Sequence, residues 1–348
     1  MRYLIFTFLL ACSTPHTKVS NKLDNQPHAS GWQKKKFPVA PSGFEVIKLA
    51  NGLKRPVWAY ETPGGDILIA EEDQISILRD TNGDGKLELK SVFLRNLNHP
   101  SGMAIIGNWF YVATTDEIKR YHYQEGMTAI TEAGLQVAKV SEEGREQWMH
   151  NLVVSESGTK IYAVVGSERD NVHVMDTDGK NDKVFAYGLR HPIGMDWHPH
   201  TGQLWVVAHD FLTVIKQGYF YGWPFKGKIP KKFPRVRVPH LKLETDSESF
   251  GLTFYHGKSF GPQYRSGAFI SQSKSHKVSF VPFSKGYPSG PAEDFLTGFI
   301  SNEKSEIHGR PSGLIELNRG ELLVCDDLGN AVWLIRSRDS LSPLLNGK

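Results

Sequence analysis

The sequence predicts an all-β fold, a six-bladed β-propeller, on three observations. A glycine-led turn runs into a short apolar strand six times along the 348 residues. These units lie about 42 to 65 residues apart, which brackets the ~40–50 residues of a four-stranded blade if the longer steps hold insertions. The chain also has 33 Gly, 19 Phe, 12 Tyr and 8 Trp, a composition that suits short strands and tight turns better than long helices.

Each repeat unit is a glycine followed within two residues by a mainly apolar run. The six units are 65–70, 107–113, 158–165, 202–208, 267–271 and 320–325. Because a single domain of this kind commonly exceeds 250 residues, one domain over residues 38–340 is expected.

Arg or His residues, commonly beside Pro or Asn, precede the strand that would line the channel in most blades. The loop that leads into each innermost strand lies at one mouth of a propeller, so equivalent positions of successive blades meet there. The residues are Arg55, His99, His150, Arg190, His191 and Arg310. Like charges on a shared rim repel, so an anionic ligand is expected among them. The alternative is that each side chain bonds carbonyl groups of the neighbouring blade and only fixes blade packing.

The N-terminus reads as a targeting segment. Residues 1–11 contain an apolar run shorter than the ~20 residues that span a bilayer, and predict a cleaved signal peptide. The run ends in Leu-Leu-Ala-Cys, which resembles a bacterial lipobox with Cys12 as the lipidated residue; the alternative is a plain secretory signal cleaved nearby. With Ser13 next, an outer-membrane lipoprotein facing the periplasm is expected. Residues 12–37 are predicted to be a flexible tether.

Charge and cysteine content exclude several classes of protein. A formal charge of +4 is too small to support nucleic-acid binding, and the basic residues after Trp223 are predicted to be a solvated loop. Cys12 and Cys325 are the only cysteines, so neither a structural disulfide nor a CxxC zinc pair is expected. A monomer is expected.

Two Asp-rich turns raise the possibility of calcium binding. The run 80–85 copies the first half of a helix-loop-helix calcium loop, but the twelfth position is Ser91, which lacks the bidentate carboxylate. The second turn, 176–179, is shorter. Both are predicted to be hairpin turns, and the metal ligands of the protein stay unknown.

Several motifs in this order resemble the soluble pyrroloquinoline quinone (PQQ)-dependent sugar dehydrogenases, especially their sorbosone dehydrogenase-like branch. The motifs are 150–167, 188–195, 198–199, 201–205, 221–224, 309–313, 322–327 and 332–333. The resemblance covers about residues 44–336 and implies a six-bladed propeller. It also implies that PQQ, a tricarboxylate, lies over one end of the channel, held by Arg and Lys side chains and a calcium ion.

Roles for individual residues follow from this resemblance by position. His150 would be the base that takes the proton of the sugar hydroxyl while hydride passes to the quinone. Arg190 and Arg310 would hold carboxylates, and Lys274 is a weaker candidate for the cofactor lysine. The full cofactor-binding set is Arg190, His191, Arg310, Lys274, Arg55, His99 and Trp223. The aromatic residues Trp148, Tyr221 and Trp223 are candidates for stacking on a flat ring, the alternative being core and rim packing.

The chain also departs from the family pattern. Relatives carry an Asn- and Asp-rich loop after the fourth strand whose carbonyls bind the catalytic calcium, whereas here 204–215 runs almost directly into 218–222. A calcium platform is therefore predicted to be missing. His191 stands where relatives have Asn, and Met149 where enzymes with strong glucose activity have Asp.

Three functions compete at this stage. The first is a periplasm-facing lipoprotein oxidoreductase that oxidises an aldose or sugar aldehyde with PQQ. The second is a catalytically degenerate propeller that binds an anionic carbohydrate or a partner protein. The third, a calcium-dependent lactonase-type hydrolase, needs acidic ligands on the axis, where the sequence offers basic groups.

Overall fold

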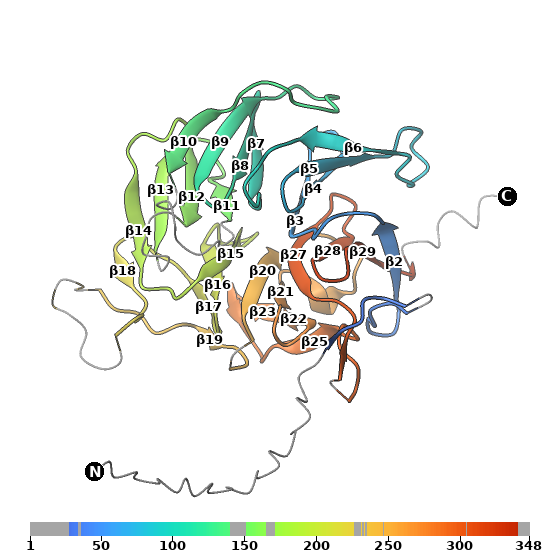
Figure 1. The fold of residues 1–348 in the computed structure, drawn as a ribbon. Helices are drawn as coiled ribbons and strands as arrows, with labels where there is room; N and C mark the ends of the chain where they lie inside the picture. Colours follow the sequence, from blue (N-terminus) through green and yellow to red (C-terminus); the bar gives the residue numbers. More distant parts are fainter. Residues whose placement is uncertain are drawn as a thin grey trace, which may run out of the picture.

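A computed structural model describes residues 28–33, 36–139, 151–164, 171–225, 231, 233, 235–245, 247–303 and 305–339. Six mainly antiparallel sheets are arranged around one central axis (Figure 1), so the predicted six-bladed propeller is confirmed. In the described residues the single helical element is a short 3₁₀ turn, η1 (Pro262–Tyr264), and no helix is long and apolar enough to cross a membrane.

The sheets are called blades 1 to 6, and their strands are given from the axis outward. Blade 1 has β3 (Trp58–Glu61), β4 (Ile67–Ala70), β5 (Ile75–Arg79) and β6 (Leu89–Leu94). Blade 2 has β7 (Met103–Ile106), β8 (Trp109–Ala113), β9 (Glu117–His122) and β10 (Leu135–Lys139). Blade 3 has β11 (Leu152–Val154), β12 (Lys160–Val164), β13 (Val172–Asp176) and β14 (Lys183–Tyr187), with β18 (Tyr219–Phe220) added in parallel.

The second half of the ring follows the same plan. Blade 4 has β15 (Pro192–Trp197), β16 (Leu204–Ala208), β17 (Phe211–Val214) and β19 (Leu241–Lys242). Blade 5 has β20 (Ser249–Phe254), β21 (Ala268–Gln272), β22 (Lys277–Val281) and β25 (Glu293–Leu296). Blade 6 has β27 (Pro311–Glu316), β28 (Leu322–Asp326), β29 (Ala331–Ser337) and β2 (Phe44–Ala50). A small hairpin pairs β23 (Phe283–Ser284) with β24 (Tyr287–Pro288).

The six glycine-led units of the sequence become the second strand of each blade. Of these strands β4, β16, β21 and β28 are buried along their whole length, because a neighbouring blade covers each of their faces. Sheets covered on both faces have nearly continuous apolar strands instead of alternating ones. The core therefore lies between blades; Trp58 of blade 1 and Phe110 of blade 2, for example, share one hydrophobic cluster.

The ring is closed by the N-terminal part of the domain. Strand β2 pairs antiparallel with β29 and forms the outer edge of blade 6, whose other strands come from the C-terminal part. Upstream of β2, β1 (His28–Ala29) pairs with β26 (Glu306–Ile307), and the Trp32 ring lies 5.0 Å from that of Trp333. Residues 28–33, predicted to be part of the tether, thus pack on the propeller.

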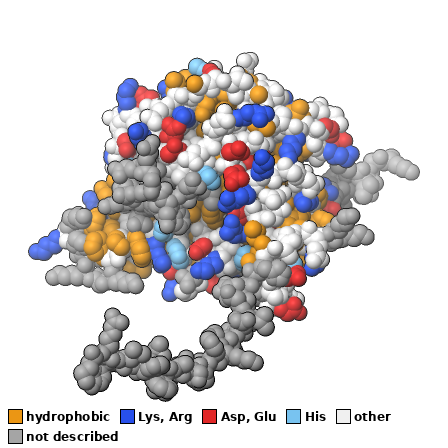
Figure 2. All heavy atoms as spheres, viewed as in Figure 1, with side chains coloured by type: hydrophobic (Ala, Val, Ile, Leu, Met, Phe, Trp, Pro, Cys, Tyr) orange, Lys and Arg blue, Asp and Glu red, His pale blue; other side chains and the backbone are white. Residues whose placement is uncertain are grey.

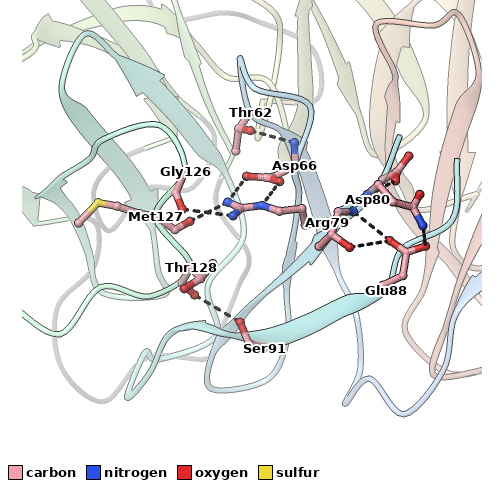
Figure 3. Close-up of polar contacts among 11 residues, drawn as sticks. Thr62, Asp66, Arg79, Asp80, Glu88, Ser91, Gly126, Met127 and Thr128 are labelled. Carbon is pink, nitrogen blue, oxygen red and sulfur yellow. Dashed lines mark hydrogen bonds and ion pairs between the residues drawn. The ribbon is translucent and has the colours of Figure 1, made fainter. Parts of the chain in front are cut away.

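Polar contacts at the rim join blades 1 and 2 (Figure 3). Arg79 binds Asp66 at two points, from Nε at 2.6 Å and from Nη2 at 2.7 Å, and donates to the carbonyls of Gly126 and Met127 at 3.2 Å. The adjacent turn holds Asp80, whose carboxylate accepts from the backbone N–H of Gly83 at 2.6 Å. The backbone N–H of Gly85, which donates at 2.7 Å, and then that of Gly83 lower the pKa of Asp80, as expected of a hairpin turn.

Candidate functional site

A cavity of about 420 Å³ lies at the mouth of the channel where the inner strands begin. Its wall comes from the residues just before β3 and β15 and from the first residues of β20 and β27. The lining residues are Arg55, Arg190, His191, Ile193, His209, Trp223, Glu248, Ser249, Phe250, Ser273, Arg310, Ser312 and Asp327. We call this cavity the basic pocket. On the face shown in Figure 2, basic, acidic and His side chains lie close together near the middle.

Five residues predicted to bind the cofactor line the basic pocket: Arg55, Arg190, His191, Trp223 and Arg310. Three separate segments of the chain therefore bring their guanidinium groups to one mouth. The calls on His150, Trp148 and Cys12 fall outside the described residues.

Three other predicted residues are placed away from the cavity wall. The imidazole Nδ1 of His99 is 3.1 Å from Asn98 Oδ1, and exposed Lys274 lies 3.8 Å from Glu248. Tyr221 is buried and donates from its hydroxyl to the Val214 carbonyl at 2.9 Å. The expectation that Tyr221 stacks on a ligand is therefore wrong, because the blade core already encloses its ring.

The backbone around the basic pocket is strained. Arg55, Arg190, His191 and Glu248 have φ of +49°, +53°, +55° and +46°, in the left-handed region that L residues avoid. Each such residue costs ~1–3 kcal/mol, and such residues concentrate at functional sites. Two of them, Arg55 and His191, precede Pro, and the neighbouring loop repeats the arrangement at His99 with φ of +50°.

Arg190 presents its charge to the cavity. Its guanidinium carbon lies 4.6 Å from the centre of the Trp223 ring, over the ring, in a cation–π contact. Among the described residues Arg190 has no carboxylate partner. It is therefore the guanidinium best placed to bind an anionic group of a ligand.

Arg310 is already paired within the protein. Its Nε and Nη2 atoms bind Asp327 Oδ1 and Oδ2 at 2.9 and 2.6 Å, and the Asp327 side chain is only 4% exposed. Behind this pair, buried Asp326 accepts from the Arg310 backbone N–H at 2.8 Å and from the indoles of Trp333 and Trp32 at 3.0 and 2.5 Å. The sequence predicted Arg310 to hold carboxylates of the cofactor. Arg310 does line the pocket, and Asp327 already binds the Nε and Nη2 edge of its guanidinium.

Arg55 has partners at both its backbone and its side chain. Its N–H donates to Asn330 at 2.9 Å, and its guanidinium lies 3.7 Å from Glu72 with both side chains about half exposed. Water screens such a pair strongly, so the Arg55 charge stays available to a ligand.

Sequence reasoning missed three ionisable residues of the basic pocket: His209, Glu248 and Asp327. Asp327 directly follows β28, which ends at Asp326. Two consecutive acidic residues at the end of a strand could have indicated that one of them reaches the pocket. His209 is likewise the first residue after β16. Glu248 precedes β20, at the same position as the basic residues of other blades. It is acidic, and the predicted pattern contained only basic residues at this position.

The connection between β16 and β17, where the sequence predicted a shortened loop, is a tight turn. Strands β16 and β17 pair from Ala208 with Phe211, which leaves a turn of only His209 and Asp210. Calcium takes six to eight oxygen ligands. Both carboxylates that line the pocket are close to cations, Asp327 to Arg310 and Glu248 to Lys274. The described residues of the pocket offer two carboxylates and so do not fit calcium, whereas Arg55, Arg190 and Trp223 fit a planar polyanion such as PQQ.

The opposite mouth of the channel holds a second cavity of about 480 Å³, lined by Glu61, Asp196, His256 and Glu316 among others. Its carboxylates are used to join blades: Asp196 accepts from the Phe254 N–H at 2.7 Å, and Glu316 from the His256 N–H at 2.6 Å. Burial raises the pKa of Asp196 to about 6, and the bond to Glu316 raises the pKa of His256. This mouth is acidic, unlike the basic pocket.

Comparisons with solved structures identify the fold. The PQQ domain of pyranose dehydrogenase from Coprinopsis cinerea, in its holo form, matches 89% of this chain and all of its own, with a TM-score of 0.72 and 16% identity. The PQQ-bound aldose sugar dehydrogenase from Streptomyces coelicolor matches 86% of this chain and 99% of its own, with a TM-score of 0.65 and 17% identity.

Sequence comparisons point the same way. An uncharacterized protein of Borreliella burgdorferi is 22% identical over 85% of this chain and 89% of its own length. The aldose sugar dehydrogenase YliI of Escherichia coli is 27% identical, over 31% of this chain and 33% of its own length. The family description "Glucose / Sorbosone dehydrogenase" matches residues 110–301, more than half of the sequence. Together with the six-bladed fold, this match shows that the chain belongs to the glucose/sorbosone dehydrogenase family.

Proposed function

We propose that this protein is an oxidoreductase that binds PQQ in the basic pocket and oxidises an aldose or a sugar aldehyde. The observation that carries the proposal is Arg190, a guanidinium without a described carboxylate partner, stacked 4.6 Å from the Trp223 ring at the wall of a cavity of about 420 Å³. Cavities of this size hold small organic ligands. A cation lying against an aromatic face suits a ligand that is both planar and anionic.

The residues have separate tasks in this proposal. When bound, PQQ would supply the hydride acceptor. Arg190 and Arg55 would hold its carboxylates by charge-assisted hydrogen bonds. Trp223 would fix the plane of the ring system. His150 would take the proton of the sugar hydroxyl, since an imidazole titrates near neutral pH without large tuning. No step is assigned to calcium, because the described oxygen donors do not fit it.

The test is calorimetric titration of the apoprotein with PQQ, followed by turnover with a panel of aldoses. Arg190→Ala is expected to weaken PQQ binding by about 10- to 100-fold, as for the loss of a hydrogen-bonded ion pair. His150→Ala is expected to retain binding and lose turnover. A wild-type protein that binds no PQQ would refute the proposal.

One observation favours a second candidate, a propeller that binds an anionic carbohydrate or a partner protein without redox chemistry. The two-residue turn at His209 and Asp210 leaves no room for the family's calcium loop, and Asp327 neutralises Arg310. A uronic-acid oligosaccharide that binds more tightly than PQQ in the same calorimeter would select this candidate.

We also propose that the protein is a periplasm-facing lipoprotein of the outer membrane, modified at Cys12. The support is the Leu-Leu-Ala-Cys run and the polar residues that follow it. Growth of an expressing bacterium with a clickable palmitate should label the wild type and Cys325→Ser but not Cys12→Ser. Equal labelling of all three would contradict this assignment.

A further inference from the structure

His209 lies in the wall of the basic pocket and has not been assigned a role. It is the first of the two residues between β16 and β17. Its backbone is fixed from both sides of the pocket, because its N–H donates to the Arg190 carbonyl at 3.3 Å and its carbonyl accepts from the Ser249 N–H at 3.2 Å. The backbone that carries the imidazole is therefore held between two lining residues of adjacent blades.

The two ring nitrogens of His209 have different surroundings. Nδ1 is buried and has no hydrogen-bond partner within the described chain. Nε2 is not among the buried atoms and has no described protein partner, while the ring itself lines the cavity. Nε2 is therefore the nitrogen that the cavity reaches.

This asymmetry decides where the proton sits on the neutral ring. A neutral imidazole carries one N–H and one lone pair. An N–H at buried Nδ1 would be a donor without an acceptor, and buried donors without a partner are rarer in proteins than buried acceptors without one. The proton is thus favoured on Nε2, where the ring presents a hydrogen-bond donor to the cavity.

We propose that His209 binds the ligand of the basic pocket directly, by donating a hydrogen bond from Nε2 to an oxygen of a planar polycarboxylate or quinone. The proposal rests on the proposed function for the choice of PQQ, but its geometry requires only an anionic oxygen acceptor held beside Arg190. Bidentate contact by a guanidinium leaves other oxygens of a polycarboxylate to be satisfied, and His209 supplies a donor from the neighbouring turn.

The experiment compares two probes on folded full-length protein: PQQ, and benzene-1,3,5-tricarboxylate, which is planar and anionic but has no redox chemistry. Binding to wild type, His209→Ala and His209→Gln is measured by calorimetry, with His200→Ala as control, an exposed His of the same blade outside the pocket. His209→Ala is expected to lose about 10- to 100-fold in affinity for both probes. His209→Gln keeps a side-chain N–H and should lose less, and His200→Ala should match wild type.

A spectroscopic measurement separates contact from a purely structural effect. In protein labelled with ¹⁵N-histidine, the His209 signal, assigned by its loss in His209→Gln, should report an Nε2–H tautomer and should shift on addition of either probe. Unchanged affinity in His209→Ala, or a His209 signal that does not respond to ligand, overturns the inference.

The outcomes for the two proposals are distinguishable. Binding of the tricarboxylate that depends on His209, with no binding of PQQ, would refute the PQQ function and support the role of His209. If wild type and His209→Ala bind PQQ with the same affinity, the PQQ function is supported and the role of His209 is refuted. A wild-type protein that binds neither probe would overturn both.

Discussion

Arg310 and Asp327 form a two-point ion pair, Nε to Oδ1 at 2.9 Å and Nη2 to Oδ2 at 2.6 Å, in the wall of the basic pocket. The carboxylate is buried while the guanidinium is 39% exposed, so the pair faces the cavity with its cationic side. The pair raises the pKa of Arg310, which keeps it charged at every accessible pH. Arg310 thus lines the pocket with its charge largely offset by Asp327.

Asp327→Asn is expected to change stability and ligand affinity in opposite directions. The free energy of unfolding should fall by about 1–3 kcal/mol, since a buried charge-assisted pair is lost. PQQ should bind about three- to tenfold more tightly, because the charge of Arg310 is no longer neutralised. Urea denaturation and calorimetry measure the two effects. Glu72→Gln, which breaks the exposed pair with Arg55, is the control, expected to change stability by less than about 1 kcal/mol.

Arg190→Lys tests whether the Trp223 contact matters beyond charge. Lysine keeps the positive charge but has no planar group to lie on the indole or to bind a carboxylate at two points. PQQ affinity is expected to fall about tenfold, measured by quenching of tryptophan fluorescence. The control is Arg235→Lys, whose guanidinium lies 5.9 Å from the Tyr219 ring and does not line the pocket. Equal affinity of Arg190→Lys and wild type would mean that charge alone acts.

Calcium removal is expected to leave PQQ binding unchanged within about twofold. The reason is the two-residue turn at His209 and Asp210, together with the two-point pairing of the pocket carboxylate Asp327 with Arg310. Titrations in EDTA and in millimolar calcium provide the comparison. A gain in affinity of tenfold or more with calcium would show that oxygen donors outside the described residues complete a metal site.

Asp196→Asn is predicted to remove part of the pH dependence of stability. The pKa of Asp196 is raised from 3.8 to about 6 in the folded protein, so between these values the folded state holds a proton that the unfolded state has lost. Wild-type stability should therefore fall as pH rises through this window. The variant should gain stability relative to wild type from pH 4 to pH 7. Urea midpoints at each pH test this, and a constant difference would contradict it.

Trp32→Phe is expected to lower the free energy of unfolding by about 1–3 kcal/mol. The indole donates to Asp326 at 2.5 Å, and Asp326 also receives the backbone N–H of Arg310, so the substitution leaves a buried carboxylate with one donor fewer. A double-mutant cycle with Asp326→Asn isolates the contact. Additive effects of the two substitutions would show that the bond contributes nothing.

The sequence predicted the features that repeat and missed those that join one blade to another. Spaced glycines located the second strand of every blade, and basic residues before inner strands located the pocket. Both worked because each sequence repeat forms one blade, so equivalent positions of successive repeats lie at equivalent places around the axis. The partner of Arg310 and the burial of His209 Nδ1 depend on side chains that meet only after the blades pack. Trp32 was assigned to a tether because the sequence around it is polar, yet its partly buried indole packs on blade 6. His150, placed by the resemblance, lies outside the described residues and stays a prediction.

Strand β2 sets an order on folding during synthesis. Residues 44–50 leave the ribosome long before β27–β29 exist, and their partner β29 is made almost last. Until then, the apolar side chains of β2 have no sheet to join, and an unpaired strand of this kind is prone to aggregate. A chain that stops before residue 331 could not close its ring at all. The propeller can therefore close only after translation has reached β29.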